Sequence, residues 1–133
     1  MKYKIIGFVL LFQAALFSAD FKTIVFDASD GVTITADLYM PHADKKHPFI
    51  VLFHQAASSR GEYREIAPKL AKLGFNSIAI DQRSGDGINN VDNETVMDAL
   101  EKDKGIEYLD ALVDLKSAIV YVKKHYAKGK VLG

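Results

Sequence analysis

The sequence predicts an α/β domain in which an antiparallel strand pair is followed by parallel βαβ units. Alternation of apolar and polar residues over 32–40 indicates a strand with one buried and one solvated face. The largely apolar runs 49–53 and 76–80 do not alternate, which is typical of strands covered on both faces, and a helical pattern separates them. Because function in parallel sheets lies at the carboxyl ends of the strands, the segments after these two runs are the first candidates for a site.

Composition sets limits on the class of protein. The 133 residues suffice for one domain, and 49% hydrophobic and 26% charged residues are ordinary globular values. The 17 basic and 17 acidic residues give a formal net charge of zero, so no net field favours nucleic acid or an acidic lipid surface as a partner. The sequence has no cysteine, which excludes disulfides, thiolate metal sites and a cysteine nucleophile.

The first residues have the organisation of a signal peptide. Lys2 and Lys4 form a positive region before the apolar run 5–17, which is too short to cross a bilayer comfortably. The sequence therefore predicts an exported protein, periplasmic or secreted, with 1–19 as the signal peptide and 20–133 as the domain. No other membrane segment is expected.

Signal cleavage is predicted between Ala19 and Asp20. Phe17, two residues before Ala19, is larger than the small residue usual at that position, so another cleavage site and an uncleaved anchor both stay open. A buried helix of the domain over 5–17 is the alternative to a signal peptide.

A hairpin is predicted at one edge of the sheet. The segment 23–26 is rich in β-forming residues, and the turn signal at 29–31, which contains Gly31, separates it from the strand over 32–40. We expect the two strands to pair antiparallel, since one solvated side is compatible with an edge position. The residues assigned to the solvated face of the second strand are Thr33, Thr35, Asp37 and Tyr39.

The loop 41–48 holds His42, Asp44 and His47. Two histidines near an aspartate can suggest a metal site, but the helical i, i+4 spacing and the flanking ligands of a zinc site are missing. We therefore predict a solvated loop and no metal.

An interrupted helix is predicted between the two buried strands. Ser59 and Glu62 have the spacing of a capping box, which places a helix start next to them. Pro68 lacks an N–H and clashes with the preceding turn, so we expect a kink, or a short first turn and a new helix near Ala67. Gly74 is predicted to end this helix as a left-handed cap. The expected apolar stripe consists of Tyr63, Ile66, Leu70 and Leu73.

The remainder of the chain is predicted as loop, two helices and a last strand. Segment 85–93, rich in Gly, Asp and Asn, is either part of a site at a strand's carboxyl end or a solvated surface loop. A short helix over 94–100 and a longer one over 107–125 follow, and 130–133 looks like the opening of another strand. The longer helix is expected to pack on the sheet through Tyr108, Leu112, Leu115, Ile119 and Val122, with Leu109, Val113 and Val120 widening this stripe.

Three segments together resemble the N-terminal half of an α/β-hydrolase of the dienelactone-hydrolase-like group. They are 52–63 (LFHQAASSRGEY), 73–76 (LGFN) and 81–85 (DQRSG), and the helix around Asp114 resembles the second helix of that fold. The resemblance covers 21–133. It implies hydrolysis of a small-molecule ester or similar acyl compound through an acyl-serine intermediate, without a cofactor.

The resemblance also implies roles for individual residues. The backbone N–H of Gln55 would donate to the oxyanion of the reaction, and His54 would shape the loop that carries it. The alternative for His54 is a strand-end residue that is hydrogen-bonded into the sheet. Asp81 and Arg83 are implied to hold the loop after the fourth strand in place as structural residues, as an ion pair.

The catalytic serine of this family lies on a Gly-x-Ser-x-Gly elbow after the next strand, and the acid and the histidine follow it. No such motif occurs in the sequence, so the resemblance places all three beyond Gly133 and implies that this chain is inactive alone. The apolar edge of the strand over 49–53 would then be poorly covered, which favours self-association.

Two other functions stay open. One is a non-catalytic half-domain that pairs its open sheet edge with a partner chain. The other is a small doubly wound ligand-binding domain, although the glycine-rich loop that would bind a nucleotide phosphate is missing after the strand over 49–53.

Overall fold

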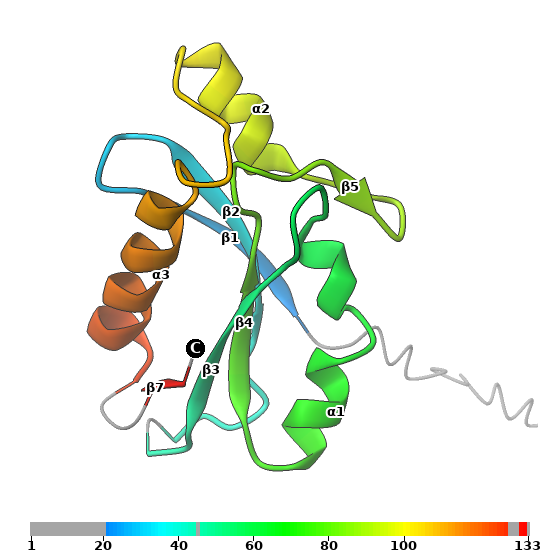
Figure 1. Ribbon diagram of the computed structural model, residues 1–133. Helices are drawn as coiled ribbons and strands as arrows, with labels where there is room; N and C mark the ends of the chain where they lie inside the picture. Colours follow the sequence, from blue (N-terminus) through cyan, green and yellow to red (C-terminus); the bar gives the residue numbers. More distant parts are fainter. Residues whose placement is uncertain (1–20, 45, 128–130, 133) are drawn as a thin grey trace, which may run out of the picture.

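The computed structural model describes residues 21–44, 46–127 and 131–132, so the predicted signal peptide and its cleavage site lie outside the described residues. These ranges contain a mixed five-stranded sheet, a two-stranded ribbon and three α-helices (Figure 1). None of these helices is long and apolar enough to cross a membrane. In spatial order, the strands of the large sheet are β1 (Lys22–Asp27), β2 (Thr33–Tyr39), β4 (Asn76–Ile80), β3 (Phe49–Phe53) and β7 (Val131–Leu132).

The strand pairing confirms the predicted hairpin and the predicted βαβ unit. β1 and β2 pair antiparallel, β2 also pairs antiparallel with β4, and β3 pairs parallel with β4 and β7. Phe53 and Ile80 are register partners, so the carboxyl ends of β3 and β4 lie side by side. β7, the strand expected near the end of the chain, pairs with β3 at Phe49 and Ile50.

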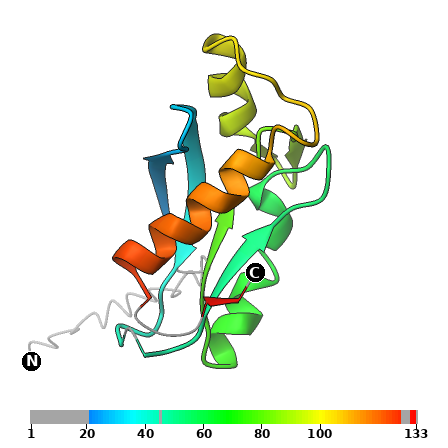
Figure 2. The same cartoon turned by 60° about the vertical axis from the view of Figure 1, so that its left-hand side comes forward.

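Helices cover both faces of the sheet. α3 (Leu112–His125) crosses one face and α1 (Ala67–Lys72) lies against the other (Figures 1 and 2). The larger core lies under α3, where Ala118 and Val122 pack on inward-facing strand residues such as Ile78. The smaller core, on the side of α1, joins Tyr39, Leu52, Ala67 and Ala79.

β2 is buried on both faces, which corrects the prediction of a solvated polar face. Thr35, Asp37 and Tyr39 are only 8%, 0% and 2% exposed. Their cover comes from segments distant in the sequence: α2 (Glu94–Glu101) brings Thr95 to accept a hydrogen bond from the N–H of Thr35 (3.0 Å), and two arginine side chains cover Asp37. The alternation in β2 therefore separates an apolar interior from a polar interior.

The segment between β3 and β4 has the interruption predicted at Pro68. A short 3-10 helix, η1 (Arg60–Tyr63), comes first, and α1 begins at Ala67 with Pro68 in its first turn. Proline is tolerated there because an N–H in the first turn has no intrahelical partner. Gly74 follows α1 with φ 93°, and the chain closes with the two hydrogen bonds of a Schellman motif, as its prediction as a left-handed cap requires.

The longer helix begins later than predicted, and a different side of it packs on the sheet. Residues 107–111 form turns, and α3 begins at Leu112. Because a helical period does not extend into these turns, Tyr108 and Leu109 do not reach the sheet and are 73% and 79% exposed. Within α3, Leu112 and Val120 are 48% and 65% exposed. The fully buried residues of the helix are Asp114, Ala118 and Val122.

We expect Gly74→Ala to lower the free energy of unfolding by about 1 kcal/mol, because a Cβ disfavours the left-handed conformation. No atom lies within 4 Å of the added Cβ, so a clash does not contribute. Gly74→Asn should cost less, since asparagine tolerates this conformation. Urea unfolding of the three proteins checks this, and equal stability of the alanine and asparagine variants would contradict it.

Candidate functional site

His54 joins the loops that follow β3 and β4. The residue is 4% exposed, its Nδ1 donates to the carbonyl of Gln55 (2.7 Å), and its Nε2 accepts from the backbone N–H of Gln82 (2.8 Å). A carbonyl only accepts and an amide N–H only donates, so this pattern requires the neutral ring with its proton on Nδ1. His54 thus holds the two loops at a fixed separation.

The N–H of Gln55, the oxyanion donor that the resemblance implies, meets a carboxylate. Gln55 is exposed at the carboxyl end of β3, and its N–H donates to Glu62 Oε2 at 3.2 Å. The predicted capping box is therefore only half formed: Ser59 Oγ accepts from the N–H of Gly61 (3.1 Å), whereas Glu62 reaches Gln55 instead of Ser59. An anionic oxygen thus lies at the N–H of Gln55.

Asn93 ties the same loops to α2. It is 1% exposed, and its Nδ2 donates to the carbonyls of Gln82 (2.7 Å) and Ser58 (3.1 Å), while its Oδ1 accepts from the N–H of Val96 at the start of α2 (3.0 Å). Gly85 packs so closely here that a Cβ would collide with Asn93 Nδ2 and the Ser58 carbonyl. The loops after β3 and β4 therefore form one rigid, tightly packed unit.

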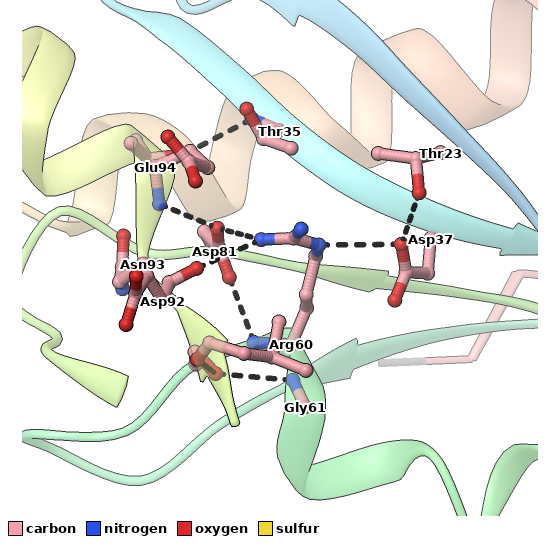
Figure 3. A network of polar contacts seen from close by, with 12 residues as sticks. Thr23, Thr35, Asp37, Arg60, Gly61, Asp81, Asp92, Asn93 and Glu94 are labelled. Carbon is pink, nitrogen blue, oxygen red and sulfur yellow. Dashed lines mark hydrogen bonds and ion pairs between the residues drawn. The ribbon is translucent and has the colours of Figure 1, made fainter. Parts of the chain in front are cut away.

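Arg60 is the centre of a buried charge network beside these loops (Figure 3). Its Nε donates to Asp37 Oδ1 (3.2 Å), its Nη1 donates to Asp81 Oδ2 (2.6 Å), and its backbone N–H donates to Asp81 Oδ1 (2.7 Å). Asp37 also pairs with Arg64 (2.9 Å), and Asp81 also accepts from the N–H of Glu94 (2.9 Å). Since both aspartate side chains are fully buried, the network joins β2, β4, η1 and the start of α2.

Arg83 forms a second charged cluster. Its side chain is 2% exposed and donates to Asp114 (2.7 Å), which is fully buried, and to both carboxylate oxygens of Asp30 (2.7 and 2.9 Å). The resemblance implied that Asp81 and Arg83 pair with each other. The structure corrects this, because Asp81 pairs with Arg60 while Arg83 ties the loop after β4 to α3 and to the β1–β2 turn.

The surroundings of these carboxylates shift their pKa values in opposite directions. Burial raises the pKa of Asp81, and the hydrogen bonds from the N–H groups of Arg60 and Glu94, together with the charge of Arg60, oppose this rise. Hydrogen bonds from Arg83 lower the pKa of Asp30 to about 2. Asp30 therefore stays ionised through the neutral and mildly acidic range.

Arg60, Asp37 and Asp114 are members of these clusters that the sequence did not reveal. Asp37 resembled a solvated residue because it alternates with apolar ones, and an arginine next to a loop is ordinarily exposed. Asp114 lay outside the face predicted for its helix, whereas the buried face in the structure consists of Asp114, Ala118 and Val122, so its burial gave no signal in the sequence.

No metal or serine–histidine arrangement forms within residues 21–44, 46–127 and 131–132. There, no three His, Asp or Glu side chains are grouped to hold a metal ion, and no serine hydroxyl is hydrogen-bonded to a histidine ring. His42 and His47 stack with ring centroids 4.4 Å apart, and their ring nitrogens lie at the carbonyls of Ala71 (3.0 Å) and Asp44 (3.3 Å).

We expect Arg60→Met to lower the free energy of unfolding by about 3–5 kcal/mol, because it leaves two buried carboxylates without their shared partner. Arg64→Met is the matched control: its side chain is 32% exposed, against 10% for Arg60, and a loss of about 1 kcal/mol or less is expected. Urea unfolding at neutral pH measures both. Equal losses would show that Arg60 does not hold the network.

The lowered pKa of Asp30 predicts a pH-dependent contribution to stability. The folded pKa, about 2, lies below the unfolded value of about 3.9, so the contribution is present above pH 4 and is lost as the pH falls towards 2. Asp30→Asn should lower stability by less than about 1 kcal/mol at pH 6, since the side chain is solvent-accessible, and by almost nothing at pH 2. Urea titrations at both pH values measure this, and equal losses at pH 6 and pH 2 would contradict it.

Comparisons with known proteins support a shared fold. No protein-family model matches the chain. A stretch of 70 residues is 30% identical to the non-reducing polyketide synthase trt4 of Aspergillus terreus, covering 47% of this chain and 3% of that protein. PA2218 from Pseudomonas aeruginosa superposes with a TM-score of 0.50 and 17% identity, over 86% of this chain and 35% of the other.

The esterase Pf2001 of Pyrococcus furiosus superposes in three crystal forms, with TM-scores of 0.56, 0.53 and 0.51 and identities of 20%, 23% and 21%. Each superposition covers 84% of this chain but 38%, 40% or 41% of the esterase, so the chain spans about two fifths of the length of that protein. At this identity the likeness concerns the fold: the described part of the chain has an α/β-hydrolase-like fold, shared with an esterase.

Proposed function

We propose that this chain is the N-terminal part of an exported, serine-dependent esterase of the dienelactone-hydrolase-like group, in which the loop after β3 supplies one oxyanion donor. The observation that carries the proposal is the N–H of Gln55. It lies at the carboxyl end of β3, next to the strand position after which the nucleophile elbow of such a fold occurs, and it donates to an anionic oxygen of Glu62.

The contact with Glu62 supports an anion-binding role for this N–H. A carboxylate oxygen and the oxyanion of a tetrahedral intermediate are both negatively charged acceptors, and the 3.2 Å distance is that of an ordinary hydrogen bond. In the complete enzyme the substrate oxygen would displace Glu62. Because Gln55 is exposed and Glu62 is partly exposed, this exchange needs no change in the core.

The rigidity of the loop supports the same role. An oxyanion donor accelerates a reaction when its position is fixed before charge develops. The carbonyl of Gln55 is held by His54, and His54 is held by the N–H of Gln82, which in turn belongs to a loop tied by Asn93. The catalytic serine, acid and histidine are proposed to lie beyond Gly133, with small carboxylic esters as substrates.

A second candidate function is an interaction half-domain that pairs its sheet edge with a partner or with a second copy. One observation favours it: β3 pairs with β7 at Phe49 and Ile50, so within the described ranges the main chain of 51–53 has no strand on that side. Exposed strand edges are templates for pairing with another chain.

The two candidates differ in whether the native protein reacts with a fluorophosphonate. For the esterase, protein purified from its native cells with an antibody against this chain should be labelled, at a mass above the 14.7 kDa of the 133 residues. The 133-residue chain expressed alone should not be labelled. A native protein of 14.7 kDa or less that is unlabelled and associates with increasing concentration would reject the esterase and favour the half-domain.

Substitutions of Gln55 in the native-length protein test the oxyanion donor itself. Gln55→Pro removes the N–H and should slow fluorophosphonate labelling and ester hydrolysis by roughly 100-fold or more. Gln55→Ala keeps the N–H and should leave both rates within about twofold, because the side chain takes no part. Equal rates for the two variants, with unchanged circular dichroism, would rule out this donor.

A further inference from the structure

A small pocket opens at the carboxyl end of β4, beside the loops described above. Its volume is about 140 Å³, and it lies between the loop after β4 and the turns that lead into α3. An apolar cavity of roughly 150 Å³ is known to accommodate a benzene ring. The pocket therefore has room for one aromatic ring or a short alkyl chain. Its lining consists of Gln82, Tyr108, Leu109, Ala111, Leu112 and Leu115.

The walls of this pocket consist largely of apolar side chains that are exposed to solvent and not packed in the core. Tyr108, Leu109 and Leu112 are 73%, 79% and 48% exposed, although they follow one another along one short segment. Contiguous exposed apolar groups around a hollow are typical of a binding site, whereas isolated ones are common on any surface.

Gln82 gives the pocket one polar group without a partner in the protein. Its backbone N–H donates to His54 Nε2 and its carbonyl accepts from Asn93, so the main chain is fully used. The residue is 6% exposed, and its Oε1 is buried without a hydrogen-bond partner among the described residues. Leaving a buried amide oxygen unpaired is unfavourable. Because Oε1 is closed off from solvent, a ligand hydroxyl in the pocket would satisfy it once the side-chain amide turns towards the pocket.

We propose that this pocket binds a compact aromatic group that carries a hydroxyl, with the ring between Leu109, Leu112 and Leu115 and the hydroxyl on the side-chain amide of Gln82. A hydroxyl suits this amide because it can both donate and accept. Binding itself does not depend on the proposed function. The assignment of the pocket to the substrate of the esterase does, and it rests on the hydrogen bond that links Gln82 to His54, next to Gln55.

The test compares phenol with toluene, which has the same size and shape but lacks the hydroxyl. The 133-residue chain, labelled with ¹⁵N, is titrated with each compound, and amide shifts are followed by NMR. Saturable shifts should appear at 108–115 and at Gln82, and phenol should bind about fivefold more tightly than toluene, in keeping with one hydrogen bond to a neutral group.

Three variants identify the groups involved. Gln82→Met removes the amide and should make phenol bind no better than toluene, whereas Leu112→Ser should weaken both compounds. Leu100→Ser is the matched control, since Leu100 is 54% exposed on α2 and does not line the pocket, and it should change neither affinity. ¹⁵N spectra of each variant confirm that it is folded.

Several outcomes would overturn the proposal: no saturable shifts, shifts that lie elsewhere in the chain, or a preference for phenol that survives Gln82→Met. The test also separates this proposal from the proposed function, because the chain studied has no Gly-x-Ser-x-Gly elbow. Phenol binding together with a native protein that does not react with the fluorophosphonate would support the pocket and reject the esterase. A labelled native protein without phenol binding would do the reverse.

Discussion

The contact on which the structure most depends is that of one buried arginine with two buried aspartates. Arg60 neutralises Asp37 in the middle of the sheet and Asp81 at the end of β4, and its own backbone N–H completes the coordination of Asp81. A buried carboxylate is tolerated only when it is paired and hydrogen-bonded, so η1 stabilises the sheet by bringing Arg60 to both aspartates. The same contact thus fixes the end of the loop that carries Gln55, where η1 begins.

The elements with local signals were predictable from the sequence. The hairpin, the restart of the helix at Pro68 and the cap at Gly74 each depend on residues that are close together in the chain. The parallel pairing of β3 and β4 followed from two apolar runs separated by a helical pattern. The prediction of a solvated face on β2 was wrong because alternation shows only that the two faces differ in polarity. It does not show whether both faces are buried. What covers Asp37 is an arginine 23 positions away, and no local pattern encodes that pairing.

The candidate site likewise has features that the sequence predicted and features that it did not. The position of Gln55 at the end of a buried strand followed from the pattern of the chain, whereas its contact with Glu62 depends on the path of the loop between them. The expected pairing of Asp81 with Arg83 was wrong because each has a nearer partner in space, and Asp114 comes from a helix 31 residues further on. Long-range charge pairing decides how the loops are held, and it is invisible to periodicity.

His54 has a consequence for how chemistry can be organised around this loop. Its Nδ1 proton and its Nε2 lone pair are both committed to backbone atoms, so the ring cannot act as a general base without releasing the loop after β4. Proton transfer would therefore have to be carried out by a different imidazole or carboxylate. In an enzyme built around this loop, one residue would position the loop and another would transfer the proton. A substitution of the second residue could then slow proton transfer without moving the loop.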